Sequence, residues 1–168
     1  MHIETKRLMI TRFTSAMARS VHENSLDEDN RRFVPDEVFE TMEIAQKTVD
    51  ELISCYDRDN APLVYPVLLK DGQNIGYVQA APLADGGWEI GYHIAKKYAG
   101  KGYATEAVRA FLPWIMEKLQ LQEMHGVCLK ENIASIRVLE RCGFEKICDG
   151  MGVYQGAERE IFRFVYRA

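Results

Sequence analysis

The stretch from Trp88 to Leu119 constrains the fold most, because it shows a strand, a glycine-rich turn and an amphipathic helix in immediate succession. Trp88 to Ile94 is apolar or aromatic at most positions, as expected of a strand that is buried on at least one face. Tyr98 to Gly102 forms the turn. Apolar residues then recur at the three-and-four spacing of one helical face, which predicts a helix that begins at about Gly102. These residues are Ala104, Ala107, Val108, Phe111, Leu112, Ile115 and Leu119.

The turn before this helix predicts a phosphate site. Gly100 and Gly102 carry no Cβ, so the backbone there can approach a bound group closely. The free N–H groups of the first helical turn and the positive end of the helix dipole attract anions, and Lys96, Lys97 and Lys101 add positive charge. The spacing meets neither the dinucleotide fingerprint nor the P-loop pattern. The turn is therefore interpreted as a pyrophosphate cradle of another kind.

Three segments carry a resemblance to a known family. The run from Lys97 to Gly102 is similar to the Q/R-x-x-G-x-G/A pyrophosphate loop of the GNAT acetyltransferases, with Lys97 in place of the usual Gln or Arg. Gly100 to Ala107, and Asn132 to Phe144 with its N-x-x-S-x-x-x-L-E-[KR]-x-G-F pattern, resemble the ribosomal-protein-alanine N-acetyltransferase-like (RimJ/RimL-type) branch of that superfamily. Glu4 to Leu8 resembles the first strand of the same branch. The resemblance therefore covers essentially the whole chain.

The rest of the chain predicts an α+β fold of three layers, as a single domain over residues 1–168. We expect a mixed, mostly antiparallel sheet of about seven strands with helices on both faces. Asp71-Gly72 joins two apolar runs as a hairpin turn would, and the strand after the central helix should lie parallel to the Trp88 strand. Predicted strands are Met1 to Thr14, Leu63 to Lys70, Gln73 to Ala81, Trp88 to Ile94, Leu121 to Leu129, Glu145 to Asp149 and Glu158 to Tyr166. Predicted helices are Ser15 to Asn24, Phe39 to Tyr56, Gly102 to Leu119 and the segment between Asn132 and Gly143.

Two segments and two prolines predict departures from regular structure. Ser25 to Asp36 is rich in Asp, Asn and Arg and is expected to be a loop, which in the resembling family helps to cover the acceptor site. Pro66 argues for an edge position or a bulge in its strand. Ala84 to Gly87 predicts a second turn, before the Trp88 strand. Pro113 falls inside the central helix, where it should remove one hydrogen bond at a cost of about 3 kcal/mol unless packing compensates.

The resemblance implies that the two parallel strands splay apart and leave a slot for the pantetheine arm of acetyl-CoA (coenzyme A). Gly91 is compatible with a bulge that helps this splaying, or with close packing alone. Free backbone groups of the central strand would pair with the pantetheine amides, and the pyrophosphate would lie on the glycine turn. The cofactor contacts implied in this way are Tyr92, His93, Ile94, Lys97, Gly100, Lys101, Gly102, Tyr103, Ala104, Thr105, Asn132 and Ser135.

The implied chemistry is attack of a primary amine on the acetyl thioester, which needs a group to take the amine's proton. Glu89 is the candidate base, since the corresponding strand carries a carboxylate in many members of the family; the alternative is a solvated strand glutamate. His93 shares the strand face and is a competing base, unless it is only packed. Many members place a Tyr acid where this chain has Leu139, so the general acid stays open. Ser135 is a catalytic candidate that would donate a hydrogen bond to the sulfur, although it and Asn132 would also suit a helix start.

The composition limits the remaining classes of function. The net charge of −4 gives no basic footprint for nucleic acid. No secretory segment or membrane span is predicted, so the cytoplasm is the expected location. The four cysteines form no C-x-x-C pair and have no histidine at ligand spacing, so no metal site is expected.

Three functional hypotheses result. The leading one is an acetyl-CoA-dependent N-acetyltransferase, acting on a small-molecule amine or a peptide N-terminus, with a homodimer as one permitted assembly. An acyl-CoA-binding module without turnover is the alternative. A nucleotide-phosphate binder that shares only the glycine turn is the third, and the block from Asn132 to Phe144 argues against it. Acidic residues in the segment from Ser25 to Asp36 would favour a cationic acceptor, unless they are only solvated.

Overall fold

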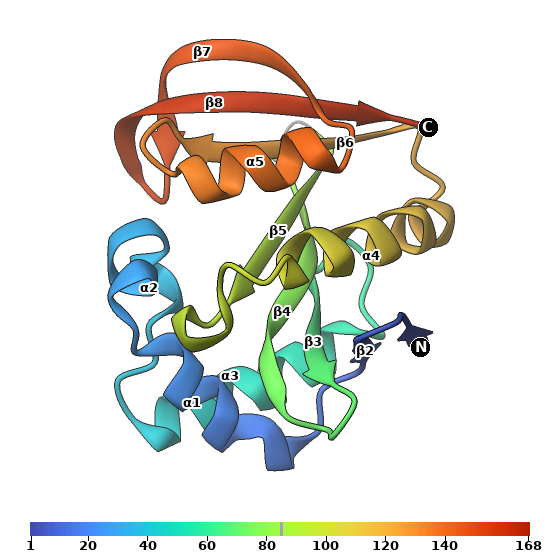
Figure 1. Cartoon of the computed structure of the whole chain (residues 1–168), viewed down its shortest axis with the longest axis vertical. Coiled ribbons are helices and arrows are strands. Elements are labelled where there is room, and N and C mark those ends of the chain that lie inside the picture. Colours follow the sequence, from blue (N-terminus) through green and yellow to red (C-terminus); the bar gives the residue numbers. More distant parts are fainter. Residues whose placement is uncertain (85) are drawn as a thin grey trace.

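The computed structural model describes residues 1–84 and 86–168, which fold around one sheet of eight strands (Figure 1). The strands are β1 (His2–Glu4), β2 (Leu8–Thr11), β3 (Leu63–Leu69), β4 (Asn74–Pro82), β5 (Trp88–Ile94), β6 (Glu123–Leu129), β7 (Glu145–Tyr154) and β8 (Ala157–Arg167). Their order is β1-β2-β3-β4-β5-β6-β8-β7, and β5 with β6 is the parallel pair among antiparallel neighbours. The predicted mixed, mostly antiparallel sheet is confirmed.

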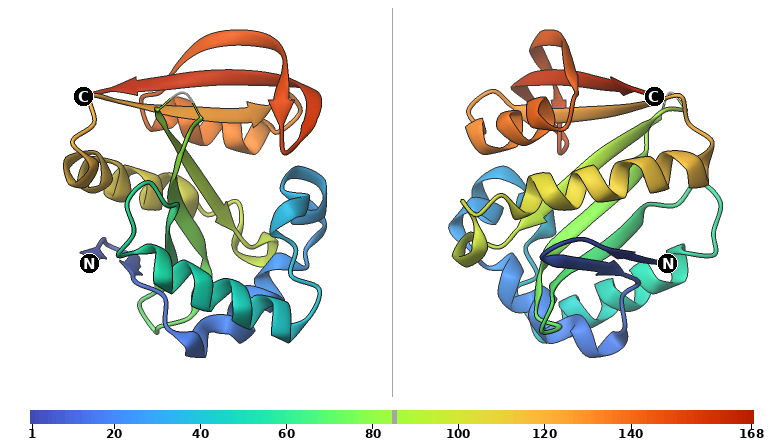
Figure 2. Two further views of the ribbon diagram at one scale, coloured as in Figure 1. Left: turned by 180° about the vertical axis from the view of Figure 1, so that it is seen from behind. Right: turned by 45° about the vertical axis from the view of Figure 1, so that its right-hand side comes forward.

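Helices lie on both faces of the sheet, as predicted. They are α1 (Ala18–Ser25), α2 (Glu28–Phe33), α3 (Met42–Cys55), α4 (Tyr103–Leu119) and α5 (Ile133–Arg141), with the 3-10 turns η1 (Ser15–Met17), η2 (Pro35–Glu37) and η3 (Lys96–Tyr98). Figure 2 shows α3 and α4 on opposite sides of the central strands. β3 is buried at nearly every position because both of its faces are covered.

The two faces of β3 enter two separate cores. Tyr65 points towards α4, with its ring centroid 5.6 Å from that of Phe111 and 5.4 Å from that of Trp114. Val64 points the other way and packs with Val49 of α3 in a smaller cluster. Burying a side chain of this size contributes about 1.5–3 kcal/mol, so α3 and α4 are each held by the apolar stripe that their sequence periodicity predicts.

The central helix confirms the prediction made from its stripe. Gly102, in the left-handed conformation at φ +79°, precedes the first residue of α4, and the first helical bond runs from Glu106 N to Gly102 O at 3.1 Å. The helix continues through Pro113, which is exposed. Phe111 and Trp114 on either side of the proline pack on the core, and this packing compensates for the hydrogen bond that proline removes.

Two predictions about the first third of the chain are wrong. The expected first strand is two short antiparallel strands with Ile3 opposite Ile10, which gives eight strands instead of about seven. The expected loop from Ser25 to Asp36 contains α2 and the first two residues of η2. Asp27 caps α2 by accepting a 2.8 Å hydrogen bond from Asn30 N. Acidic residues fill the first turn of α2 and basic residues the last turn, so a polar composition here serves a short helix.

The hairpin of β3 and β4 is confirmed, and Pro66 lies where the pairing changes. β2 pairs with β3 only from Val67 onwards, and the β3–β4 register shifts between Val67 and Leu68. Pro66 therefore has no partner on the β2 side, as at an edge, and lies next to a bulge, so both expectations are met at this point of the strand. The turn expected from Ala84 to Gly87 includes Asp85, which lies outside the described residues.

The parallel pair separates almost at once. β5 pairs with β4 along its whole length, whereas its register with β6 is the single pair Glu89 and His125. Gly91 causes no register shift; a Cβ there would lie 2.5 Å from Gln79 Nε2, so close packing is the reason for this glycine. Figure 1 shows β5 leaving the layer of β6, β8 and α5 at an angle.

Candidate active site

A cavity of about 380 Å³ lies where β5 and β6 separate. Its lining residues come from β4, β5, β6, α5, β7 and β8 and from the α2–η2 segment. The chemically active side chains among its lining residues are Glu37, Tyr77, Gln79, Glu89, Tyr92, His125, Asn132, Ser135, Tyr154 and Arg163. The structure therefore brings Glu89, Tyr92, Asn132 and Ser135 together, four residues that the sequence had singled out.

Glu89 is positioned by the alternation of β5. Trp88 and Ile90 are buried, and Glu89 faces away from them into the cavity. Burial raises the pKa of this carboxyl to about 7, and the backbone N–H of Val127 and the charge of Arg163 moderate the rise. Such a group gains and releases a proton near neutral pH, which a general base must do.

Two further residues of the cavity were not selected from the sequence. Burial raises the pKa of Glu37 to about 7, helped by the neighbouring Asp36 and opposed by a hydrogen bond with Gln79. Burial also raises the pKa of Tyr154 to about 12, and the charges of Glu89 and Glu37 add to the rise. Tyr154 is therefore electrostatically coupled to both carboxyls. Neither residue belongs to a sequence motif, and only the fold brings them to Glu89.

On the α5 side, hydroxyl groups face the cavity. The Tyr92 hydroxyl donates to Ser135 O at 2.9 Å and lies 2.9 Å from Ser135 Oγ. Asn132 Oδ1 accepts from Ser135 N at 3.1 Å, so the predicted helix cap is confirmed. Leu139, the position at which the family resemblance led us to look for a Tyr acid, is 1% exposed and belongs to the core. Tyr92 and Ser135 thus bring hydroxyls to the cavity from β5 and α5.

His93 lies apart from Glu89. It lines a neighbouring cavity of about 350 Å³, and its Nε2 is 3.7 Å from Asp27 Oδ2. Asp27 in turn accepts a 2.9 Å hydrogen bond from Lys96 N. The two candidate bases share a strand face, but the structure distributes them between two cavities.

The glycine turn has the geometry that its sequence predicts. Gly100 and Gly102 have φ values of +77° and +79°, and among the described residues only Arg7 Nη2 lies within 4 Å of a Cβ placed on either, 3.6 Å from that of Gly102. The first helical bond begins at Glu106 N, so the three preceding N–H groups have no carbonyl one turn earlier. A cavity of about 620 Å³ adjoins this turn. The donors and the open glycine surface fit a pyrophosphate.

Arg7 braces the turn, a role that sequence reasoning missed. Its guanidinium donates to Glu106 Oε2 at 2.6 Å and to Lys101 O at 2.8 Å, and stacks 4.6 Å from the Tyr103 ring centroid. Thr5 Oγ1 donates to Glu106 Oε1 at 2.7 Å. Arg7 and Thr5 belong to the segment from Glu4 to Leu8, whose resemblance to the family was the one sign in the sequence that these residues have a role.

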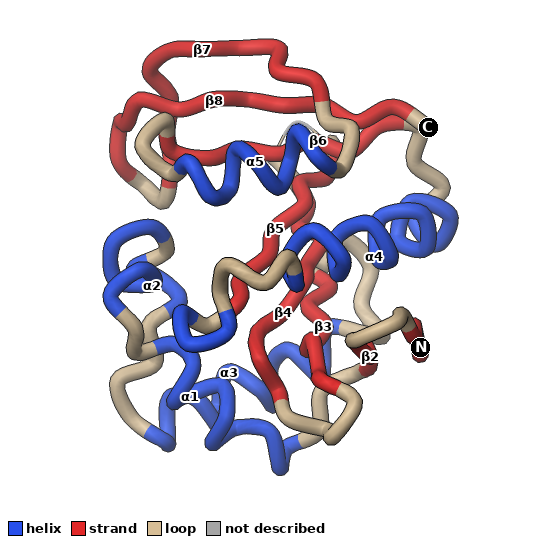
Figure 3. The backbone as a smooth tube through the Cα atoms, viewed as in Figure 1, coloured by secondary structure: helices blue, strands red, loops and turns tan. Residues whose placement is uncertain are grey.

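Basic side chains surround the turn unequally. Lys97 and Lys101 are exposed. Arg109 and Arg141 line the 620 Å³ cavity with Gly102 and Thr105. Lys96 turns away instead, with Nζ 3.3 Å from Glu28 and 3.4 Å from Asp29, and holds η3 against α2. Figure 3 shows this η3 segment passing beside α2. The charge expected from Lys96 is thus neutralised, and the two arginines add positive charge from other elements.

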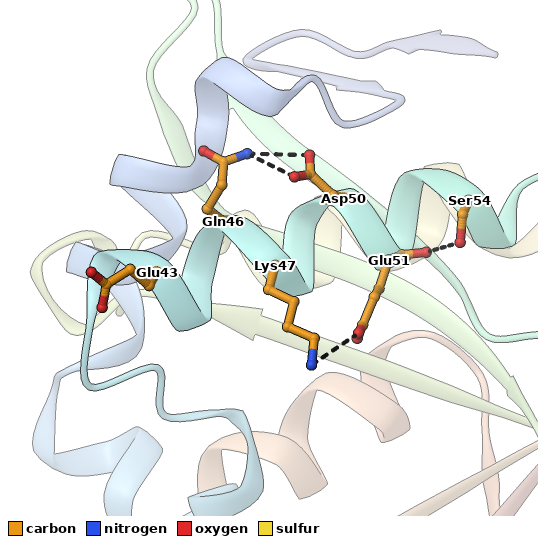
Figure 4. Close-up of a pocket in the computed structure, with 6 residues that line it drawn as sticks. All are labelled: Glu43, Gln46, Lys47, Asp50, Glu51 and Ser54. Carbon is orange, nitrogen blue, oxygen red and sulfur yellow. Dashed lines mark hydrogen bonds and ion pairs between the residues drawn. The ribbon is translucent and has the colours of Figure 1, made fainter.

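A shallow hollow on α3 has a different character (Figure 4). Its six lining residues, from Glu43 to Ser54, belong to one helix face, where Gln46 donates to Asp50 at 3.1 Å and Lys47 lies 3.8 Å from Glu51. Such pairs one turn apart stabilise a solvated helix surface by a few tenths of a kcal/mol. Among residues 1–84 and 86–168, no helix is long and apolar enough to cross a membrane, and no group of three potential metal ligands is found.

Comparison with known proteins agrees with this geometry. Residues 7–145 match the family model described as acetyltransferase (GNAT) domain. The uncharacterized N-acetyltransferase YnaD of Bacillus subtilis (strain 168) is 33% identical over 148 residues, 87% of this chain and 84% of that protein. A solved GNAT-family acetyltransferase from Bacillus anthracis is 25% identical, with a TM-score of 0.84 over 99% of this chain and 98% of that one. RimL, a ribosomal L7/L12 alpha-N-protein acetyltransferase solved with coenzyme A, shares the fold at 16% identity, with a TM-score of 0.84 over 99% of this chain and 98% of its own.

The splayed parallel pair, the glycine turn at the start of α4 and the capped start of α5 together define an acyltransferase. The chain belongs to the GNAT family of acetyltransferases. The resemblance that was based on the glycine turn and on the Asn132 to Phe144 block is confirmed.

Proposed function

We propose that this chain is an N-acetyltransferase that uses acetyl-CoA and acts on a primary amine, with residues 1–168 as one catalytic domain. The observation that carries the proposal is Glu89, a carboxyl whose pKa is raised to about 7 and which lies at the point where β5 and β6 separate. A base at this point can reach a group held in the slot between the two strands. Membership of the family supports the acetyl donor.

The residues that would hold coenzyme A run from the slot to the start of α4. The backbone of Tyr92, His93 and Ile94 has no β6 partner and would pair with the pantetheine amides. Asn132 and Ser135 would contact the arm from α5. The turn at the start of α4 would receive the pyrophosphate, and Lys97, Arg109 and Arg141 would be the neighbouring charges. The residues of this turn are Gly100, Lys101, Gly102, Tyr103, Ala104 and Thr105.

Bound acetyl-CoA would supply the acetyl group as a thioester. Glu89 takes one proton from the amine, directly or through one water, so that the nitrogen lone pair can form the C–N bond to the carbonyl carbon. As the C–S bond breaks, the sulfur would leave with the electron pair and take the second nitrogen proton, so that the products are the amide and a free thiol. Ser135 Oγ, 2.9 Å from the Tyr92 hydroxyl, would turn its proton from Tyr92 to that sulfur and lower the cost of the negative charge there. Tyr154 and Glu37 line the same cavity as Glu89.

The test is acceptor-dependent release of coenzyme A thiol. Amines of different size and peptides with free N-termini are offered with acetyl-CoA, and thiol is measured against the hydrolysis background. We expect release above background with at least one amine and loss of that release with Glu89→Gln. Tight coenzyme A binding without release across the whole panel would refute the proposal and favour a binding module without turnover.

A further inference from the structure

The second cavity, the one lined by His93, lies next to the cavity of Glu89. Glu37, Tyr77 and Gln79 line both, so the two cavities adjoin at these three side chains. Its volume of about 350 Å³ is at the lower end of the range for small-molecule sites. The part of it between β3 and α3 is apolar and is formed by Phe13, Val21, Phe39, Leu52 and Val64.

Hydrogen-bond acceptors gather at the end of this cavity that is shared with the first. The Glu37 carboxyl lies there, and Asn30 Nδ2 donates to Glu37 O at 3.1 Å, which holds the Asn30 amide beside it. Asn30 Oδ1 is buried and has no hydrogen-bond partner among the described residues, and Asn30 is 1% exposed, whereas His93 Nε2 faces the Asp27 carboxylate at 3.7 Å. Buried polar atoms are nearly always paired, so unpaired atoms in a cavity wall mark a place where a ligand can donate.

We infer that this cavity binds the apolar body of the acceptor, and that the acceptor is a compact primary amine with a hydrocarbon or aromatic substituent. The ammonium group lies where the two cavities adjoin, so that Glu37 and Asn30 Oδ1 accept its N–H groups and Glu89 faces it from the first cavity. The substituent then extends between β3 and α3, against Val64 and Leu52. This inference rests on the proposed N-acetyltransferase activity and specifies its substrate class.

The chemistry of the walls selects against a peptide. Each peptide unit brings an N–H and a C=O that would lose their water partners against Phe13, Val64 and Leu52, at a cost of about 1–3 kcal/mol for each unpaired group. An arylalkylamine has one polar group, and Glu37 and Asn30 Oδ1 accept its hydrogen bonds where the two cavities adjoin. The acidic Glu37 also favours a cation over a neutral or anionic body.

The test measures binding to the protein saturated with coenzyme A, by calorimetry, so that no turnover is needed. Three probes are compared: 2-phenylethylamine, ethanolamine and a tetrapeptide made of Ala and Ser residues. Thr48, which lines the apolar part of the cavity from α3, is replaced by Phe to fill it. Lys47→Phe puts the same side chain on the neighbouring, 80% exposed position of the helix and serves as the control.

We expect 2-phenylethylamine to bind wild type and Lys47→Phe at least about tenfold more tightly than either other probe, and Thr48→Phe to lose this preference. Equal binding of ethanolamine or the tetrapeptide to wild type, or unchanged binding of 2-phenylethylamine to Thr48→Phe, would overturn the inference and leave the proposed acetylation untouched. Conversely, selective amine binding in a protein that releases no thiol with any acceptor would support the cavity and refute the proposed function.

Discussion

Replacing Glu89 by Gln should slow acetylation and stabilise the fold at the same time. Gln keeps the size and much of the hydrogen-bonding shape of a protonated Glu but has no carboxylate. Loss of a general base costs about 10²- to 10⁴-fold in kcat/KM. The folded protein holds the Glu89 proton up to about pH 7, whereas an unfolded glutamate loses it near its ordinary pKa of 4.5.

The sign of the stability effect follows from this raised pKa. Between pH 4.5 and about 7 the native state binds more protons than the unfolded state. The stabilising contribution of Glu89 to the free energy of unfolding is therefore fully present below pH 4.5 and is lost as the pH rises through about 7. A rise from 4.5 to about 7 corresponds to about 3 kcal/mol. Relative to wild type, Glu89→Gln should therefore be more stable at pH 8 than at low pH by about this amount.

Two measurements check the prediction. In wild type, kcat/KM for an alkylamine should rise below pH 7 and level off above it; in Glu89→Gln the break should move to the pKa of the amine itself, about 10. Urea unfolding at pH 5 and pH 8 should show the growing stability difference. A Gln variant that keeps the rate and the break near pH 7 would refute the reasoning. If His93→Gln loses them instead, His93 is the base, and if neither matters, the site only orients neutral amine.

The remaining predictions concern the glycine turn. Gly102→Val should abolish coenzyme A binding in calorimetry, because a β-branched residue at φ +79° is strained and covers the donor surface. Gly72→Val is the control. Gly72 lies at φ +87° in the β3–β4 turn with open space around it, so this variant carries the same strain of about 1–3 kcal/mol and should bind coenzyme A normally. Equal loss in both variants would show that strain alone acts. Arg7→Gln should weaken coenzyme A binding by about tenfold, since it removes the charged contacts to Glu106 and Lys101 O; unchanged affinity would contradict the bracing role.

Much of the fold was predictable because single elements carry their own signals. The stripe of α4, the Asp71-Gly72 turn and the capping Asn132 depend on neighbours a few residues away, and each was confirmed. The segment from Ser25 to Asp36 misled, because the same polar residues serve a loop or a short capped helix, and the choice depends on contacts such as Lys96 with α2.

The sequence by itself determined the glycine turn, the parallel pair around it and therefore the family, because these depend on backbone conformations that few residue types adopt. Only the tertiary structure decided what surrounds Glu89. Glu37 and Tyr154 lie 52 and 65 residues from it along the chain, and no local pattern links them. Burial, which raises the pKa of Glu89 and Glu37 to about 7, results from elements that meet only in the folded sheet. The chemistry of the site therefore depends on packing between distant segments, while its place in the fold was already readable in the chain.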